Sequence, residues 1–240
     1  MERGPLDIGT SQRNSLPALA PKPAPDDGAP SATRDDLQLG RRLFHLLNGV
    51  ATASAYAVLF THEQVIHIFG TIACVVYIAD RVRIAYPEVV AQRAPSVNRL
   101  FLRAEEQVRE AAMTPFAIAV LLTIITVPKL AALVGIYSLA IADPLAAVVG
   151  IRYGRHRITQ NRSVEGSLAF FAATLAIAAL VLNWGTTAAP LTIAGAASTI
   201  ALAAAACEIV PIRIDDNLTI PLFVAFLTWV VAAAFGIALA

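Results

Sequence analysis

The sequence carries little charge for a chain of its length. Of its 240 residues only 15% are charged, whereas 57% are hydrophobic, and the mean hydropathy is +0.66. In a soluble globular protein about a quarter of the residues are charged. The composition therefore excludes an ordinary soluble domain and predicts a chain embedded in a lipid bilayer.

Neither sign of charge is in excess, and cysteine is scarce. Eighteen Lys and Arg stand against seventeen Asp and Glu, a net charge of +1, which gives no support to nucleic-acid binding. The two cysteines, Cys74 and Cys207, lie in separate apolar stretches. This separation argues against a disulfide scaffold or a metal-binding pair and is typical of small buried hydrophobic residues.

The N-terminal segment differs in composition from the rest. Residues 1–37 hold six of the fourteen prolines and no long apolar run. Such a segment cannot bury enough apolar surface to offset the chain entropy lost on folding. We therefore expect a disordered tail at 1–37 and a membrane-embedded domain at 38–240.

Long apolar runs predict seven membrane-spanning helices. Residues 111–150 contain two charges and residues 166–207 contain none. As single helices each would be roughly 60 Å long, twice the ~30 Å hydrocarbon layer, so each must turn back once. The predicted spans are 43–60, 64–79, 112–127, 130–150, 164–184, 190–207 and 219–240.

The distribution of positive charge predicts the sidedness of this all-α polytopic bundle. With the N-terminus in the cytoplasm and the C-terminus outside, every Lys and Arg except Lys129 falls on the cytoplasmic side, as the positive-inside rule requires. Residues 81–110 then form a cytoplasmic loop in water. Within it, residues 97–110 have helical spacing and could lie along the membrane surface.

Asp143 is a carboxylate inside a predicted span. It lies about 10 Å from the cytoplasmic end of that helix, where a lone carboxylate costs about 2.5–3.5 kcal/mol or more. Pro144 opens the backbone hydrogen-bond ladder, and Ala147 and Gly150 leave one helix face bare for close approach. A bound metal ion would compensate the charge, and pairing with an arginine is the structural alternative.

The loop after this span combines glycines with arginines. Gly150 and Gly154 lead into it, and it carries Arg152, Arg155, Arg157 and Arg162. The next helix starts near Ser163, where backbone N–H groups, the helix dipole and guanidinium groups favour phosphate binding. Close helix packing would explain the glycines. It explains neither the arginines nor Glu165 in the first turn.

A further cluster precedes the first predicted span. Arg41, Arg42 and His45 share one helical face, where an anionic headgroup or phosphate could bind. Positive-inside flanking with an interfacial histidine is the alternative.

The last cluster precedes the final span. Asp215, Asp216 and Asn217, with Glu208 nearby, offer oxygen ligands of the kind that Mg²⁺ prefers. The Asp-Asp-Asn triplet is also a good helix cap. Its position on the same membrane face as Asp143 favours the metal interpretation.

Together these motifs resemble the family of dolichol kinases, phytol kinases and CTP-dependent diacylglycerol kinases. The resemblance runs from about residue 38 to the C-terminus, and its most specific block extends from Asp143 to Ser167. It implies an integral membrane kinase that transfers the terminal phosphate of CTP, or of another nucleoside triphosphate, to a lipid alcohol. One departure is Arg162, where the family usually has Lys.

From the clusters and the resemblance we expect four groups of site residues. Catalytic roles are expected for Asp143, Glu165, Asp215 and Asp216; nucleotide binding for Gly150, Gly154, Arg155, Arg162, Ser163, Gly166 and Ser167; phosphate or substrate binding for Arg41, Arg42, His45 and Asn217; and Mg²⁺ binding for Asp143, Glu208 and Asp216.

Two alternatives stay open. A cytidylyltransferase that forms a CDP-lipid would need the same CTP, metal and lipid partner. A small transporter would use Asp143 as its coupling acid, but it gives no reason for the four arginines of the loop.

Overall fold

The computed structural model describes residues 39–87, 113–159, 162–210 and 216–239. All of them belong to one unit, Ala32–Ala240, and the regular elements of these ranges are helices. The predicted tail at 1–37 and the segment 97–110 lie outside the described residues.

Helices occupy each predicted span. They are α2 (Leu39–Val58), α3 (His62–Ala85), α6 (Met113–Thr126), α7 (Lys129–Tyr137), the π-helix η1 (Ser138–Ala142), α8 (Asp143–Tyr153), α9 (Val164–Gly185), α10 (Pro190–Ile209) and α11 (Asp216–Ala234). Five spans in the described ranges are long and apolar enough to cross a membrane, with α7, η1 and α8 forming one of them. The apolar parts of α2 and α6 are shorter, so the number of seven spans stays a prediction.

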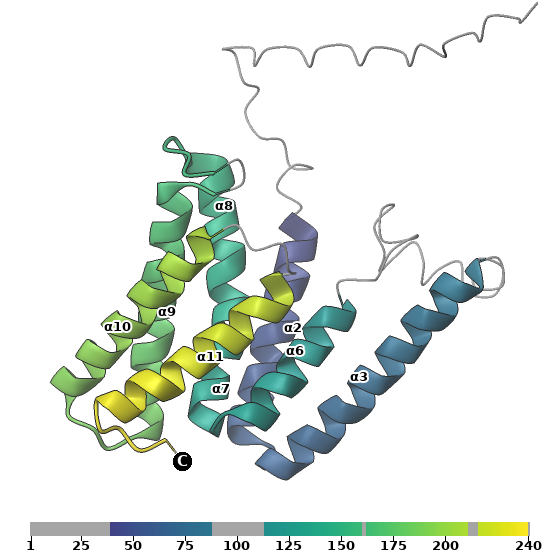
Figure 1. Cartoon of the computed structure of the whole chain (residues 1–240), viewed down its shortest axis with the longest axis horizontal. Helices are drawn as coiled ribbons and strands as arrows, with labels where there is room; N and C mark the ends of the chain where they lie inside the picture. Colours follow the sequence, from purple (N-terminus) through teal and green to yellow (C-terminus); the bar gives the residue numbers. More distant parts are fainter. Residues whose placement is uncertain (1–38, 88–112, 160–161, 211–215, 240) are drawn as a thin grey trace, which may run out of the picture. The chain divides into compact units, whose positions relative to one another are not determined.

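The span made of α7, η1 and α8 lies at the centre of the bundle. Its α7 part packs against α2, α6, α9 and α11, while α3 packs against α6 at one edge (Figure 1). Leu133, Ile136 and Leu139 are fully buried there. A Cβ atom on Gly135 would lie 2.8 Å from Ala225 Cβ, so the glycine lets α11 approach closely.

A π-helical turn precedes Asp143. The backbone N–H of Asp143 donates to Ser138 O, five residues earlier. Pro144 follows and has no N–H to continue the regular ladder. The irregular turn therefore coincides with the position where the sequence analysis expects an opened backbone.

The predicted loop start at residue 81 was wrong. Helix α3 continues to Ala85 and includes Arg83, which is buried. The guanidinium of Arg83 pairs with Asp80, and Thr114 Oγ1 of α6 donates to Asp80 Oδ2 at 3.2 Å. Because these buried charges are paired and hydrogen-bonded, the helix continues through residues 81–85 and does not end before them.

The predicted end of the last span was also wrong. Helix α11 ends at Ala234 and not at residue 240. Gly236 follows with a φ angle of +67°, the left-handed conformation that commonly ends a helix.

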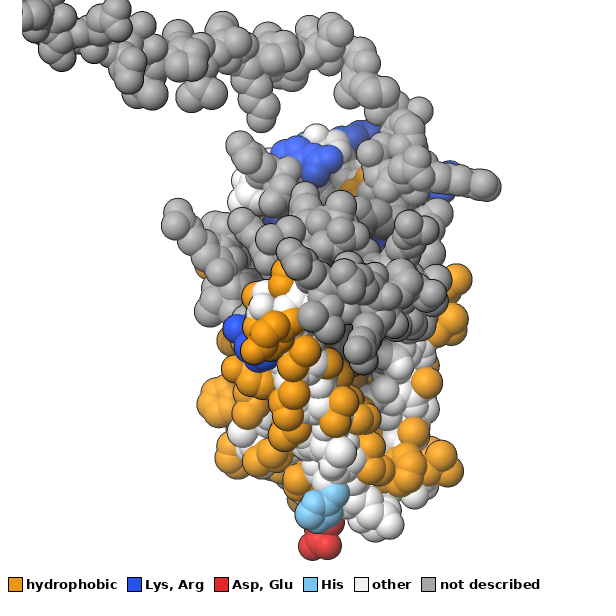
Figure 2. All heavy atoms as spheres, turned by 90° about the vertical axis from the view of Figure 1, so that its right-hand side faces the viewer, with side chains coloured by type: hydrophobic (Ala, Val, Ile, Leu, Met, Phe, Trp, Pro, Cys, Tyr) orange, Lys and Arg blue, Asp and Glu red, His pale blue; other side chains and the backbone are white. Residues whose placement is uncertain are grey.

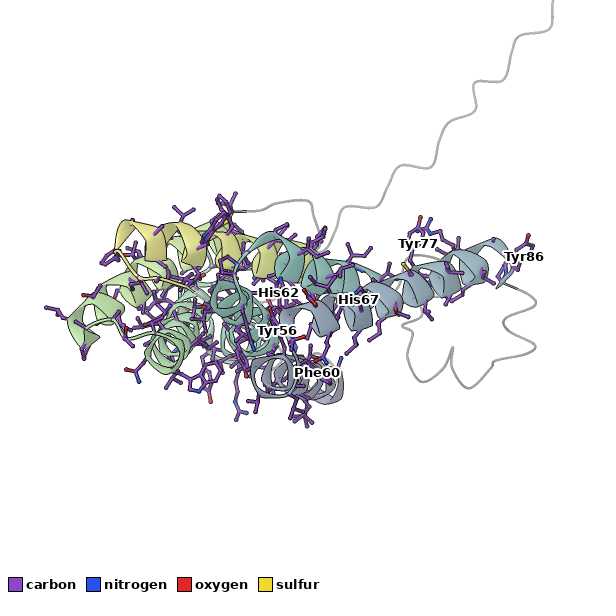
Figure 3. The ribbon with its side chains drawn as sticks, turned by 90° about the horizontal axis from the view of Figure 1, so that it is seen from below. Tyr56, Phe60, His62, His67, Tyr77 and Tyr86 are labelled. Atoms are coloured by element: carbon purple, nitrogen blue, oxygen red, sulfur yellow. The ribbon has the colours of Figure 1, made fainter. Side chains whose placement is uncertain are left out.

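The turn between α2 and α3 is fixed by polar side chains. Thr61 and Gln64 form a capping box at the start of α3. The Tyr56 hydroxyl and His62 Nδ1 are 2.7 Å apart, and the two side chains lie together in Figure 3. The Lys129 ammonium lies 5.3 Å from the Tyr56 ring centroid. The lone positive charge predicted for the outer side is thus held against an aromatic ring.

The surface on the α3 side agrees with a membrane protein. Figure 2 shows hydrophobic side chains over much of the described part of this face, with Lys and Arg gathered toward one end. Only 17% of the apolar stretch of α3 is buried within the structure. Its free apolar side is suited to contact with lipid.

Candidate functional site

Arg162 joins the loop between α8 and α9 to two other helices. Its Nη1 donates to Glu208 Oε1 at the end of α10. Its Nη2 donates to Asp216 Oδ2 at the start of α11, at 2.8 Å. Glu208 is buried, and its second oxygen, Oε2, accepts from Ser167 Oγ at 3.0 Å. One guanidinium therefore ties three helix ends together.

Asp143 faces the same group of charges. Its side chain is half-buried in the first turn of α8. Its carboxylate is close enough to interact electrostatically with Asp216, Arg162, Arg42 and Glu208. Residues that are far apart in the sequence thus converge, as the sequence analysis predicts. The guanidinium groups of Arg162 and Arg42 offset part of the cost of this intramembrane carboxylate, whereas Asp216 and Glu208 add to it.

The loop before α9 folds back on itself. Ile158 N–H donates to Arg162 O at 3.0 Å, and Val164 N–H donates to His156 O at 2.9 Å. Ser163 caps α9, because its Oγ accepts from Gly166 N–H at 3.1 Å. One N–H group of the predicted phosphate site is therefore already used by the cap.

The glycines of α8 and α9 lie at a close helix contact. A Cβ atom on Gly166 would lie 2.9 Å from Ala146 O, and one on Gly150 would lie 3.1 Å from Ser163 Oγ. A Cβ atom on Gly154 would meet Ser163 and Gly150 O. The packing interpretation of these glycines therefore has direct support, and their role toward a nucleotide stays a prediction.

Glu165 belongs to a separate contact. Its Oε1 is 2.8 Å from Nδ1 of His156 and accepts from the His156 backbone N–H at 3.3 Å. This pair fastens the loop to the first turn of α9. Sequence reasoning missed His156, because nothing in the spacing of the loop indicates which polar side chain Glu165 would meet.

A groove begins at the charged cluster and continues among apolar side chains. Its volume is about 370 Å³, and Arg162, Glu208 and Asp216 line its polar end. Apolar residues of α9, α10 and α11 line the rest, among them Phe170, Ala204, Cys207, Leu218, Phe223 and Val224. The site therefore combines a polar end with an apolar channel.

Two curated proteins show sequence similarity to the chain. The uncharacterized protein MJ1137 of Methanocaldococcus jannaschii is 31% identical over 198 residues, which are 79% of this chain and 92% of that protein. The chain belongs to the MJ1137 family. Phytol kinase of Synechocystis sp. is 38% identical over 103 residues, 41% of this chain and 43% of that protein. The chain therefore spans less than half the length of this phytol kinase.

No protein-family model matches this MJ1137 family member, and no solved structure matches it. The partial similarity to phytol kinase supports a phytol-kinase-like family at most. The residues of the site must therefore carry the more specific arguments.

Several predicted site residues lie outside the described part of this MJ1137 family member. They are Asp215 and the side chains of Arg41 and His45. Arg42 is half-buried, and its positive charge interacts with the carboxylate of Asp143. Asn217 is half-buried in the first turn of α11, and Arg155 is exposed in the loop before α9.

The donor set for a metal ion is only partly assembled. Within the described ranges, no group of three His, Cys, Asp or Glu side chains could hold a metal ion. Glu208, one of the three predicted ligands, is occupied by Arg162 and Ser167. Asp143 and Asp216 offer two carboxylates, and Mg²⁺ commonly binds one or two carboxylates together with substrate phosphates. Asp216 Oδ2 also accepts from Arg162 Nη2, so Mg²⁺ binding by Asp143 and Asp216 stays a prediction.

Proposed function

We propose that this protein is a lipid-alcohol kinase of the cytoplasmic membrane face. It transfers the terminal phosphate of CTP, or of another nucleoside triphosphate, to the hydroxyl of a lipid such as phytol, a polyprenol or diacylglycerol. The observation that carries the proposal is the convergence of Arg162, Glu208 and Asp216 at one end of an apolar groove, with Asp143 close enough to interact electrostatically with all three. The similarity to phytol kinase supports the reaction class.

In the proposed phosphoryl transfer, Asp143 and Arg162 have different roles. The lipid hydroxyl oxygen bonds to the terminal phosphorus, the bond from that phosphorus to the bridging oxygen breaks, and the nucleoside diphosphate leaves. Asp143 accepts the hydroxyl proton because it is a half-buried carboxylate that interacts electrostatically with Arg162 and Asp216 of the polar end. Arg162, held in place by Glu208 and Asp216, stabilises the charge on the phosphates.

Mg²⁺ would be held by Asp143 and Asp216. When bound, it would neutralise phosphate charge and orient the terminal phosphate. Because Asp143 could then serve as ligand instead of base, its proton-accepting role is a separate part of the proposal.

Labelled nucleotide tests the reaction class. We expect purified protein with Mg²⁺ and phytol to transfer label from γ-labelled CTP to the lipid, and none from α-labelled CTP. Lipid that carries the α label together with cytosine would instead show cytidylyl transfer. Flux of a solute into proteoliposomes without nucleotide, in the absence of any labelled lipid, would favour the transporter. A parallel series with γ-labelled ATP determines the donor.

A further inference from the structure

The groove has a polar end and an apolar wall, which together suit an amphiphilic ligand. Its polar end consists of Arg162, Glu208 and Asp216, and its remaining wall is almost entirely hydrophobic. A ligand that fills it must therefore carry one polar head and one apolar body. Because the polar end is shared with the proposed phosphoryl-transfer site, the head of that ligand lies where the chemistry is proposed.

The groove is placed to receive such a molecule from the side. It is lined by residues of α10 and α11, which pack side by side (Figure 1) and are both long and apolar enough to span a membrane. One of its apolar wall residues within the predicted spans reaches the protein surface: Phe223 of α11 is 38% exposed. In a bilayer the surroundings of such side chains are lipid tails, so a lipid could enter without passing through water.

The size of the groove limits what it can hold. Ligand pockets commonly measure about 300–1,000 Å³ and bury most of a drug-sized molecule, and this groove, at about 370 Å³, is near the lower limit. It has room for the head and the first part of one chain. A long tail must continue into the bilayer, and a second chain attached near the same head has no space.

We propose that the groove between α10 and α11 binds the hydroxyl-proximal segment of a single-chain lipid alcohol and leaves the rest of the tail in the membrane. This inference rests on the proposed function for the role of the hydroxyl and adds a substrate class. Prenols of different length are accepted similarly, because their tails lie outside the groove. Diacylglycerol, with two chains near one hydroxyl, is excluded.

Thiol protection tests binding without catalysis. Cys207 lines the groove, and Cys74, an exposed residue of α3, is removed by Cys74→Ala. Labelling of Cys207 by N-ethylmaleimide is followed in phosphatidylcholine nanodiscs without nucleotide. Phytol at about ten times its Kd should slow labelling about tenfold, because it leaves roughly a tenth of the sites free.

The control ligands separate a specific site from general lipid contact. Farnesol and a long polyprenol should protect as phytol does, whereas the hydrocarbon phytane and diacylglycerol should leave the labelling rate unchanged. Equal protection by phytane or diacylglycerol would overturn the proposal. A Cys207 thiol that reacts at the same rate with and without phytol would also overturn it, because an occupied groove must exclude the reagent.

A matched pair of variants tests the same groove through activity. Cys207→Phe fills the channel, whereas Ala206→Phe places the same side chain at the neighbouring exposed position of α10. We expect Cys207→Phe to raise the KM for phytol about tenfold, as about 1.4 kcal/mol of lost binding would, with the KM for CTP unchanged. Equal KM values for phytol in both variants would contradict the proposal.

Thiol protection and enzyme activity together show whether the groove assignment or the kinase function fails. Selective protection by alcohols without phosphoryl transfer would leave the groove assignment standing and remove the kinase function. Phosphoryl transfer to phytol without protection, and with equal variants, would keep the kinase function and remove the groove.

Discussion

Arg162 holds together two carboxylates that would otherwise repel each other. Glu208 is buried and depends on Arg162 and Ser167 for its hydrogen bonds. Removal of one partner from a buried ion pair commonly costs about 3–5 kcal/mol, because the other charge stays buried without compensation. The residue is therefore expected to matter for stability as well as for phosphate binding.

Arg162→Ala should lower the thermal unfolding midpoint of the detergent-solubilised protein by several degrees. The double variant Arg162→Ala with Glu208→Gln should recover part of the loss, since the neutral amide needs no counter-charge. Circular dichroism at 222 nm along a temperature ramp measures both. If Arg162→Ala melts as the unchanged protein does, the ion pair contributes nothing to the fold.

Asp143→Asn should separate chemistry from folding. The amide cannot accept the hydroxyl proton and is a poorer ligand for Mg²⁺, so we expect kcat to fall by about a hundredfold or more. The protein should still insert and should be at least as stable, because an intramembrane charge next to Asp216 and Glu208 is removed. Glu63→Gln, at an exposed position in the first turn of α3, is the control, and its rate should be unchanged. Substantial activity in Asp143→Asn would refute the catalytic role.

Convergence of the charged residues could be predicted, but their pairing could not. The cost of a lone carboxylate in a membrane requires that Asp143 meet compensating groups, and the positive-inside distribution limits these groups to one membrane face. Arg162 meets Glu208 and Asp216 across 46 and 54 residues of sequence. Such pairs depend on how the helix ends pack, and no local spacing encodes them.

At the scale of elements, the contact between α8 and α9 positions the loop that carries Arg162. The contact is close because Gly166 faces Ala146 O, and an added Cβ atom would lie 2.9 Å from that oxygen. Since backbone atoms form the opposing surface, the clash cannot be relieved by a side-chain rotation. The helices would have to move apart, and the loop with them.

Gly166→Ala and Gly70→Ala make the same chemical change in two helices. Alanine favours a helix over glycine by about 1 kcal/mol, and a Cβ atom on Gly70 meets nothing within 4 Å. Gly70→Ala should therefore keep or slightly raise the thermal midpoint. Gly166→Ala should lower it, because forced overpacking costs about 1–3 kcal/mol, and should reduce activity. Identical melting of the two variants would show that the α8–α9 contact is looser than described.

Helix positions follow from the sequence better than helix irregularities do. Apolar length and the ~30 Å membrane thickness predict where the chain must turn back. They do not predict that α3 continues through Arg83, because hydropathy alone counts a charge as exposed although Asp80 pairs with it. They also do not show the π-turn before Pro144, which depends on one missing backbone donor and on the packing around it.

At the scale of the whole molecule, the charges of the described residues divide between two ends. The loop between α8 and α9 carries Arg155, Arg157 and Arg162, whereas Lys129 begins α7 at the other end. The positive-inside rule predicts that the arginine-rich end faces the cytoplasm. The proposed function needs this orientation, because nucleoside triphosphates are cytoplasmic.

Single cysteines on opposite ends test the sidedness. In a Cys74→Ala, Cys207→Ala background, Thr187→Cys lies in the turn between α9 and α10, and Arg157→Cys lies in the loop between α8 and α9; both positions are exposed. A membrane-impermeant maleimide applied to intact cells should label Thr187→Cys at once and Arg157→Cys only after permeabilisation. The reverse pattern would place the cluster of Asp143 and Arg162 away from cytoplasmic nucleotide and would exclude a CTP-dependent kinase whatever the arrangement of its side chains.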